Sequence, residues 1–274
     1  MKLVVGGILD DNQERIFVGG TPFPLNTDAT STDVGSFLVS YVAGSGTGIF
    51  TVVPDATDPA IATKASFQSL LQGITYLHDS DNPTDGDRTV AISVTDAGLS
   101  DATTFTSELT SSFAMAIINV DPVNDQPTIS GLTDVSVSEN AINAAAAVLD
   151  SDVTVTDADS ADYNGGTLTV STVSGTATVS LPSSASTVLG NVQKAATGSN
   201  VEYYNGSAWI PVGTWSGGAG ANFVVTWNSS ATAAIAERVI ENLTYANSSQ
   251  APSATRTLTL ALNDGDGGSI QNAT

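Results

Sequence analysis

The stretch Val120-Asp121-Pro122-Val123-Asn124-Asp125-Gln126-Pro127-Thr128-Ile129 separates two long runs of alternating apolar sequence. Its two prolines fix their own φ angles and favour an extended conformation at the residue before each of them. The stretch therefore predicts a short, stiff strap between two β units. Its two aspartates and its asparagine offer side-chain oxygens, which are the ligands that hard cations prefer.

Composition narrows the classes of partner. The chain of 274 residues has 28 acidic and 7 basic residues, a formal net charge of -21. A surface of this sign repels nucleic acid and anionic lipids, and favours divalent cations or serves solubility alone. Cysteine is absent and His78 is the single histidine, which excludes disulfides and the usual zinc sites.

No apolar run approaches the ~20 residues of a membrane span, so we expect no membrane insertion. The apolar run at the N-terminus, residues 1–9, is too short for a signal peptide with its cleavage site. We expect the export signal to lie elsewhere on a longer parent chain.

Short alternating runs rich in β-branched residues recur along the whole chain, separated by Gly, Asn, Asp, Ser and Pro. This pattern is typical of a β-sandwich. The runs are residues 16–18, 37–42, 49–53, 89–95, 114–120, 153–156, 167–172, 201–204, 223–227 and 256–262. Only residues 63–72 and 232–241 have a helical pattern.

The two helical segments belong to an internal repeat. Each is followed closely by a Thr-Tyr pair, which ends at Tyr76 in the first copy and at Tyr245 in the second. Each copy continues through a proline-containing loop into an Arg-Thr pair and a strand ending on aspartate. The chain therefore reads as two copies of one module, residues 1–125 and 126–274.

A turn upstream of the helices sets the register of the two copies. Gly19 to Pro24 resembles Gly206 to Pro211, with an aromatic residue before each proline. On this alignment the first module lacks its N-terminal strands, the counterpart of residues 127–187, and the second lacks its last strand. The modules are then either part of a longer repetitive chain or completed by neighbouring subunits.

Several stretches together resemble the cadherin-like repeats of large bacterial surface proteins. They are Asp121 to Pro127, Val137-Ser-Glu139-Asn140-Ala, Asp157-Ala-Asp159-Ser160 with Asn164-Gly-Gly-Thr-Leu-Thr-Val, Leu243-Thr-Tyr-Ala-Asn, and Asn263-Asp264-Gly-Asp266-Gly-Gly. The first copy departs from the pattern, because its early motifs are missing and Asp96-Ala97-Gly98 replaces Asp-Gly-Asp.

The resemblance implies an all-β fold of two tandem cadherin- or Ig-like Greek-key β-sandwich modules, each with one short helical turn. It also implies an extracellular or bacterial cell-surface location, of the kind found in type I-secreted adhesins and biofilm matrix proteins. Calcium is the cofactor that it implies at the joint between modules.

The candidate calcium ligands fall into two groups. Asp121, Asn124 and Asp125 of the strap join Asp157 and Asp159, whose two-residue spacing directs both carboxylates to one side of an extended segment. The resemblance places the second group, Glu139 with Asp264 or Asp266, at the opposite end of the second module. Asp10, Asp11 and Glu14 are weaker candidates in the first module. The alternative for all of them is an ordinary role in turns and caps.

The leading hypothesis is a non-enzymatic structural repeat in which calcium stiffens the joint of a rod-like surface or matrix protein. Its partners would be neighbouring modules or identical subunits. One alternative is an adhesin module that binds cell-surface glycans or proteins through Trp209 and Trp215, with Trp227 in the core. Another is a filament subunit that assembles by strand donation.

An enzyme is the least favoured class. Serine hydrolase chemistry would need His78, which we expect to be a solvated loop residue, and no Gly-x-Ser-x-Gly motif surrounds any serine.

Overall fold

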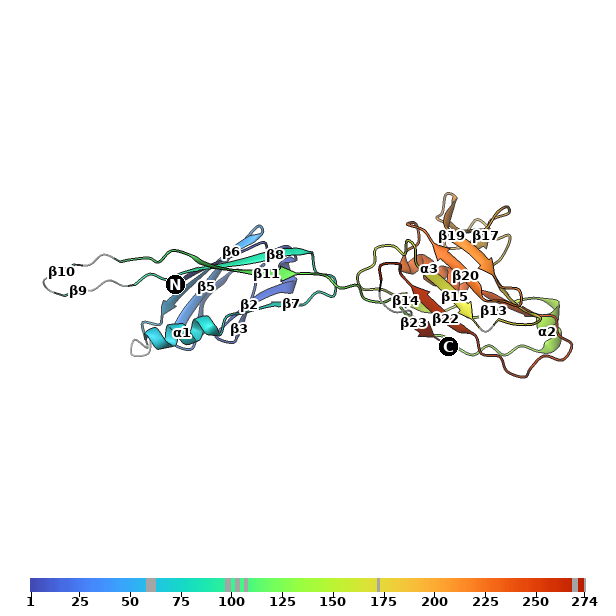
Figure 1. Ribbon diagram of the computed structural model, residues 1–274, viewed down its shortest axis with the longest axis horizontal. Helices are drawn as coiled ribbons and strands as arrows, with labels where there is room; N and C mark the ends of the chain where they lie inside the picture. The colour runs from blue at the N-terminus through green and yellow to red at the C-terminus, as the bar shows by residue number, and fades with distance from the viewer. Residues whose placement is uncertain are drawn as a thin grey trace. The chain divides into compact units, whose positions relative to one another are not determined.

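The computed structural model forms two compact units, unit 1 of Met1–Val123 and unit 2 of Asn124–Thr274 (Figure 1). It describes residues 1–57, 63–96, 100–101, 104–105, 108–171, 173–267 and 271–273. The sheets are antiparallel and the helices few and short, so the predicted all-β class is confirmed. The units divide inside the predicted strap, close to the expected boundary after residue 125.

Unit 1 has a six-stranded and a three-stranded sheet. Its elements are β1 (Lys2–Gly6), η1 (Asp11–Gln13), β2 (Glu14–Val18), β3 (Thr21–Pro24), β4 (Ala29–Val34), β5 (Phe37–Gly44), β6 (Thr47–Pro54), α1 (Lys64–Gln72), β7 (Thr75–His78), β8 (Gly86–Ser93), β9 (Ser100–Asp101), β10 (Thr104–Phe105) and β11 (Ala114–Val120). The larger sheet has the order β11-β8-β1-β6-β5-β4, and the smaller has the order β3-β2-β7. Strands β9 and β10 form a separate pair.

Unit 2 has a seven-stranded sheet and two smaller ones. Its elements are β12 (Thr128–Ser130), α2 (Glu139–Ala144), β13 (Ala147–Val148), β14 (Thr154–Thr156), β15 (Thr167–Ser171), β16 (Ala177–Ser180), β17 (Val192–Lys194), β18 (Asn200–Tyr204), β19 (Trp209–Gly217), β20 (Phe223–Trp227), α3 (Ala233–Glu241), β21 (Thr244–Asn247), β22 (Thr259–Asn263) and β23 (Gln271–Ala273). The largest sheet has the order β17-β18-β19-β20-β15-β22-β23, and the others are β13-β21-β16 and β12-β14.

Both predicted helical segments are confirmed as α1 and α3, but the expectation of one helical turn in each module is wrong for unit 2, which also contains α2, capped by Ser138. A threonine caps each of the two predicted helices: Thr63 accepts a hydrogen bond from the N–H of Ser66, and Thr232 accepts one from the N–H of Ile235. Such caps satisfy backbone donors that the first helical turn leaves free. Helices α1 and α3 each lead into a strand that begins Thr-Tyr, β7 in unit 1 and β21 in unit 2.

The strand orders of the two units correspond, but they align the two copies differently from the alignment expected from the sequence. β1 lies between β6 and β8 as β15 lies between β20 and β22, and β2 pairs with β7 as β16 pairs with β21. Strand β1 therefore corresponds to β15. Unit 2 residues from about 127 to 164 have no counterpart in unit 1, and the expected limit at 187 is wrong.

The error came from the turn that set the register. Gly19 lies between β2 and β3, whereas Gly206 lies between β18 and β19, which belong to a different sheet. Glycine and proline recur in turns because their backbone conformations suit them, so a likeness between two turns does not establish equivalent positions. The expected absence of a last strand in unit 2 is also wrong, since β23 pairs with β22. Ala97 and Gly98 lie outside the described residues.

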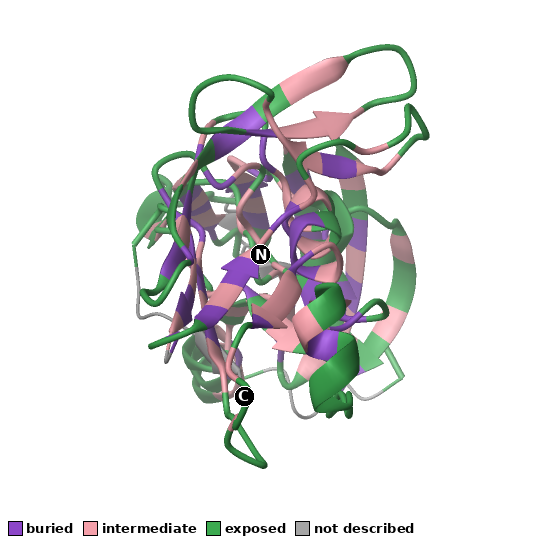
Figure 2. Ribbon diagram, turned by 90° about the vertical axis from the view of Figure 1, so that its right-hand side faces the viewer, coloured by how far each residue is buried: buried purple, intermediate pink, exposed green. Residues whose placement is uncertain are grey.

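Each unit buries side chains from both of its larger sheets in one core. In unit 1, Phe50 of the larger sheet lies 5.5 Å from Phe23 of the smaller sheet, centroid to centroid. In unit 2, Val179 of β16 joins Leu168 and Phe223 of the seven-stranded sheet. Buried residues alternate with more exposed ones along the strands (Figure 2), as the period of two requires.

One buried carboxylate of unit 2 serves the fold alone. Oδ2 of Asp150 accepts hydrogen bonds from the N–H (2.7 Å) and the hydroxyl (3.0 Å) of Thr133, and Oδ1 accepts one from the N–H of Asp152 (3.2 Å). Burial opposes ionisation, but the hydrogen bonds outweigh it and lower the pKa of Asp150 to about 2.

Asp150 should therefore make the stability of unit 2 sensitive to acid. In the unfolded chain the pKa of an aspartate is about 3.9. A carboxyl group whose pKa is lower than this in the folded chain stabilises the fold at pH values above about 3.9. This contribution is lost as the pH falls towards 2. Urea unfolding should show that Asp150→Asn lowers the free energy of unfolding at about pH 5 and much less at about pH 2.5. Equal effects at both pH values would refute this role.

Candidate metal centre

Two turns of unit 2 contact the strap. Nδ2 of Asn124 donates to Oδ2 of Asp264 (3.0 Å) and to the carbonyl oxygen of Gly267 (3.0 Å). The hydroxyl of Ser160 donates to Oδ1 of Asn124 (3.4 Å), and the N–H of Asp125 donates to Oδ2 of Asp159 (2.9 Å). The strap is thus held against the turn after β14 and the turn after β22.

Local hydrogen bonds shape both turns. Oδ1 of Asp157 accepts from the N–H groups of Asp159 (3.3 Å) and Ser160 (3.0 Å), and Oδ1 of Asp264 accepts from the N–H of Asp266 (3.0 Å). Aspartate commonly stabilises turns in this way. Asp157 and Asp264 each use one oxygen for the turn, which leaves the other directed elsewhere.

Two glycines permit the close approach of these turns. A Cβ at Gly166 would lie 2.2 Å from the carbonyl oxygen of Asn263, and a Cβ at Gly265 would lie 2.4 Å from that of Asn164. Gly265 also has φ +99°, a region that disfavours other residues. The glycines therefore allow the end of β22 to lie against the segment before β15.

The electrostatics of this region are unusual for a protein interior. Asp264 is 1% exposed, and Oδ2 of Asp157 is a buried atom. No ion pair in the described part of the chain includes either residue. Buried charge is costly unless it is paired or bound to a cation.

The negative charge of this region raises the pKa of two neighbouring groups. Burial, with the charges of Asp157 and Asp125, raises the pKa of Asp159. Tyr163 is fully buried, and its hydroxyl interacts with the carboxylate of Asp157. The pKa of Tyr163 is raised by burial, then by the charge of Asp157 and a hydrogen bond to it, and by the charge of Asp264.

The structure groups the predicted calcium ligands differently from the sequence-based prediction. Asn124, Asp125, Asp157 and Asp159 lie together as expected, and we name them with Asp264 the acidic cluster. The expectation that Asp264 accompanies Glu139 at the opposite end of the module is wrong. Asn263 at the end of β22 pairs with Thr167 at the start of β15, so Asp264 falls beside residues 157–164.

The remaining predicted ligands lie outside the acidic cluster. Glu139 is exposed at the start of α2, at the end of unit 2 away from β14 (Figure 1). Asp266 is exposed, and it reaches the cluster through its backbone N–H. Asp121 is exposed and belongs to unit 1, directly after β11. Tyr163, Ser160 and Gly267 were not predicted as site residues, since in the motifs that contain Ser160 and Gly267 the acidic residues alone were taken as ligands.

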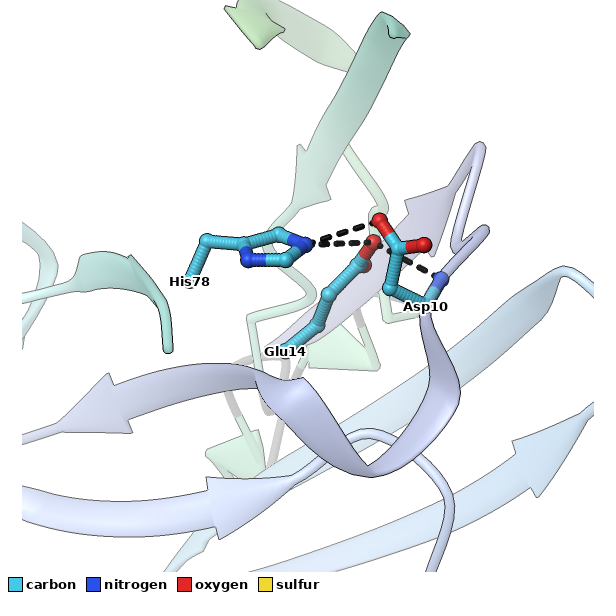
Figure 3. Close-up of side chains that lie close together, drawn as sticks. All are labelled: Asp10, Glu14 and His78. Carbon is cyan, nitrogen blue, oxygen red and sulfur yellow. Dashed lines mark hydrogen bonds and ion pairs between the residues drawn. The ribbon is translucent and has the colours of Figure 1, made fainter. Parts of the chain in front are cut away.

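A second group of acidic side chains lies in unit 1 (Figure 3). Ligand atoms of Asp10, Glu14 and His78 all lie within 4.8 Å of one another. Nη2 of Arg88 lies 2.7 Å from Oδ2 of Asp10 and 2.7 Å from Oε1 of Glu14. The guanidinium of Arg88 is fully buried, so it supplies the positive charge that a metal ion would bring.

His78 completes this network and is not the solvated residue expected. Its side chain is 9% exposed, with Nε2 2.8 Å from Oδ2 of Asp10. Its Nδ1 accepts a hydrogen bond from the N–H of Ser80, which assigns a proton to Nε2. A proton on Nε2 and the nearby guanidinium both disfavour metal binding by Asp10 and Glu14, so we interpret the group as an ion-pair network.

The tryptophans offer little binding surface. Trp227 is buried in the core of unit 2, as predicted. Trp215 stacks on Phe223 at 6.3 Å and lies under Nζ of Lys194, 4.6 Å from the ring centroid. Trp209 is half-buried against Tyr204. Trp215 is thus covered by its own chain.

Comparison of the chain with protein-family models, with curated proteins and with solved structures gives no match. Among the described residues, no helix has the length and apolar character needed to cross a membrane.

Proposed function

We propose that the acidic cluster of unit 2 binds calcium. The observation that carries this proposal is the buried carboxylate of Asp264, whose hydrogen-bond donors within the described part of the chain are neutral: the side-chain amide of Asn124 and the N–H of Asp266. The buried Oδ2 of Asp157 and the buried hydroxyl of Tyr163, which lies against that carboxylate, support it. These are oxygen atoms in a place where a cation would remove an electrostatic cost.

The chemistry of the cluster favours calcium over other metals. Calcium takes about 6–8 oxygen ligands in flexible geometry, whereas zinc and copper prefer the nitrogen or sulfur ligands that this cluster lacks. The carboxylates of the cluster do not converge as closely as Asp10, Glu14 and His78 do. Like charges without a cation between them repel one another, so a wider spacing is expected before binding.

Binding at this place would tie the strap to unit 2. Asn124 and Asp125 follow directly on unit 1 in the chain, and they already contact the turns that carry Asp159 and Asp264. Calcium would replace weak neutral contacts with strong electrostatic ones, and so restrict motion of the strap. A chain of such units would then be stiffer with calcium than without it.

We accordingly propose a non-enzymatic structural role in an extracellular or bacterial surface protein. Its two units would be tandem cadherin-like β-sandwich modules of Greek-key type, with neighbouring modules as partners. The resemblance of the strap and of the Asp157–Asp159 segment to such repeats supports this role. In the described part of the chain one edge of β7 has no partner strand, and this favours strand binding as a second candidate function. Of the two tryptophans proposed for glycan binding, Trp209 alone remains a candidate.

Calcium titration tests the proposal directly. Full-length protein freed of metal with EDTA should bind calcium with a Kd of about 10⁻⁴ to 10⁻³ M, the range of extracellular calcium modules. Isothermal titration calorimetry measures this binding. Asp134→Asn, at an exposed acidic residue of unit 2 outside the cluster, should bind equally well. Absence of saturable binding, or an equal loss in Asp134→Asn and in a cluster variant, would overturn the proposal.

A further inference from the structure

Strand β7 of unit 1 has a free edge where its counterpart in unit 2 has a partner. In unit 2, β21 pairs with β16 on one side and with β13 on the other, where Ala147 lies opposite Tyr245. In unit 1, β7 pairs with β2, and no other strand in the described part of the chain pairs with it. The internal repeat thus shows what a complete edge looks like.

The backbone of β7 presents hydrogen-bonding groups along this edge. The N–H of Asp79 donates to the carbonyl oxygen of Gln13 (2.9 Å). The backbone N–H and C=O groups of every second residue, counted from Asp79 towards the N-terminus, therefore face β2. Tyr76, between them, directs its N–H and C=O away from β2. In unit 2, the N–H of Leu149 donates to the carbonyl oxygen of Leu243 (2.9 Å), and Ile74 is the matching residue in unit 1.

Apolar side chains line the same side of unit 2 and are covered there. Val153 and Val155 are buried in its core, and the N–H of Val155 donates to Glu237 of α3 (3.0 Å). Beneath this segment Ile240 of α3 is 1% exposed and Leu243 is fully buried. The segment containing β13 and β14 therefore shields the helix and the edge of β21.

Among the described residues of unit 1, no segment covers the matching side in this way. Leu71 of α1 corresponds to Ile240, and Ile74 corresponds to Leu243, yet both are only half-buried. Leu77 of β7 is 40% exposed. Exposed edge strands are usually protected by charged residues or proline, and the edge residues Thr75, Tyr76 and Leu77 supply neither.

We propose that unit 1 binds, along β7 and α1, an extended segment with the chemistry of residues 145–157 of unit 2. The internal repeat defines the chemistry of this partner: a strand that pairs with Tyr76, followed by alternating aliphatic residues such as Val153 and Val155 supply in unit 2. This is β-augmentation, in which backbone hydrogen bonds give affinity and apolar contacts give specificity. It does not depend on calcium binding by unit 2.

A peptide with the sequence of residues 145–157 tests the proposal on the full-length chain. Titration monitored by NMR should show saturable binding and protection of the Tyr76 N–H from hydrogen exchange. Leu71→Glu should weaken binding at least about tenfold, a loss of ~1.4 kcal/mol. Val53→Glu, at an exposed valine of β6 in the same unit, should leave binding unchanged.

Three results would overturn the proposal. The first is no binding of the peptide, and the second is equal weakening by Leu71→Glu and Val53→Glu. The third is protection of Tyr76 that rises with protein concentration in the absence of peptide, which would make a second folded copy the occupant. Should Leu71→Glu fail to fold, a peptide carrying Val153→Asp and Val155→Asp serves instead. That peptide should not protect Tyr76 in the unaltered protein, and protection by it would also contradict the proposal.

Discussion

Replacement of Arg88 by methionine should destabilise unit 1 by about 3–5 kcal/mol, the usual cost of removing one partner from a buried ion pair. Arg88 and Glu14 are both fully buried, and Arg88 makes hydrogen bonds to Oε1 of Glu14 through Nε (3.0 Å) and Nη2 (2.7 Å). Without the guanidinium, the carboxylate of Glu14 remains buried and uncompensated. Its Oε2 already lacks a hydrogen-bond partner.

Urea unfolding with a matched surface variant isolates this effect. Arg15→Met removes an ion pair with Asp79 in the same unit, but those side chains are about a third exposed (32% and 37%). Exposed pairs contribute roughly 0–1 kcal/mol, so this variant should unfold close to the wild type. The double variant Glu14→Gln with Arg88→Met should recover part of the loss. Similar losses in the Arg88 and Arg15 variants would refute the buried network.

Asp264→Asn should change the stability of unit 2 in opposite directions with and without calcium. In EDTA the variant removes one of several mutually repelling carboxylates, so the free energy of unfolding should rise. In excess calcium it removes a ligand, so calcium affinity should fall at least about tenfold and the calcium-bound protein should become less stable than the wild type.

The sign reversal distinguishes a metal ligand from a structural aspartate. An aspartate that serves the turn alone would lose stability in both conditions when replaced, because its hydrogen bonds to Asn124 and Asp266 would weaken. Thermal unfolding of wild type and variant in calcium and in EDTA gives the four values required. A loss of equal size in both conditions would remove Asp264 from the proposed site.

Local sequence patterns predicted those features of the fold that depend on local physics. Helices α1 and α3 were found because threonine caps and apolar spacing act within a few residues. The strap was found because prolines restrict their own backbone. Asn124, Asp157 and Asp159 were assigned to one place because the strap and the segment after β14 carry recognisable acidic patterns.

Features that depend on strand pairing were not predicted. The position of Asp264 follows from the antiparallel pairing of β22 with β15, which brings together residues about 100 positions apart along the chain. The network of Arg88 needs β2 beside β7, and β1 beside β8, before Glu14 and Asp10 can approach it. The glycine turn misled the alignment because turns share residues wherever they occur.

Calorimetry of the full-length protein in excess calcium and in EDTA tests calcium binding by unit 2 most directly. At calcium concentrations about 100 times the Kd, binding stabilises the folded state by ~2.7 kcal/mol. For a unit of this size that corresponds to a rise of roughly 5–10 °C in the unfolding temperature. The Arg88→Met variant identifies the unfolding transition of unit 1, because the substitution lowers the temperature of that transition. The transition of unit 2 should rise with calcium while that of unit 1 stays fixed, and a unit 2 transition that calcium leaves unchanged would contradict the proposed function.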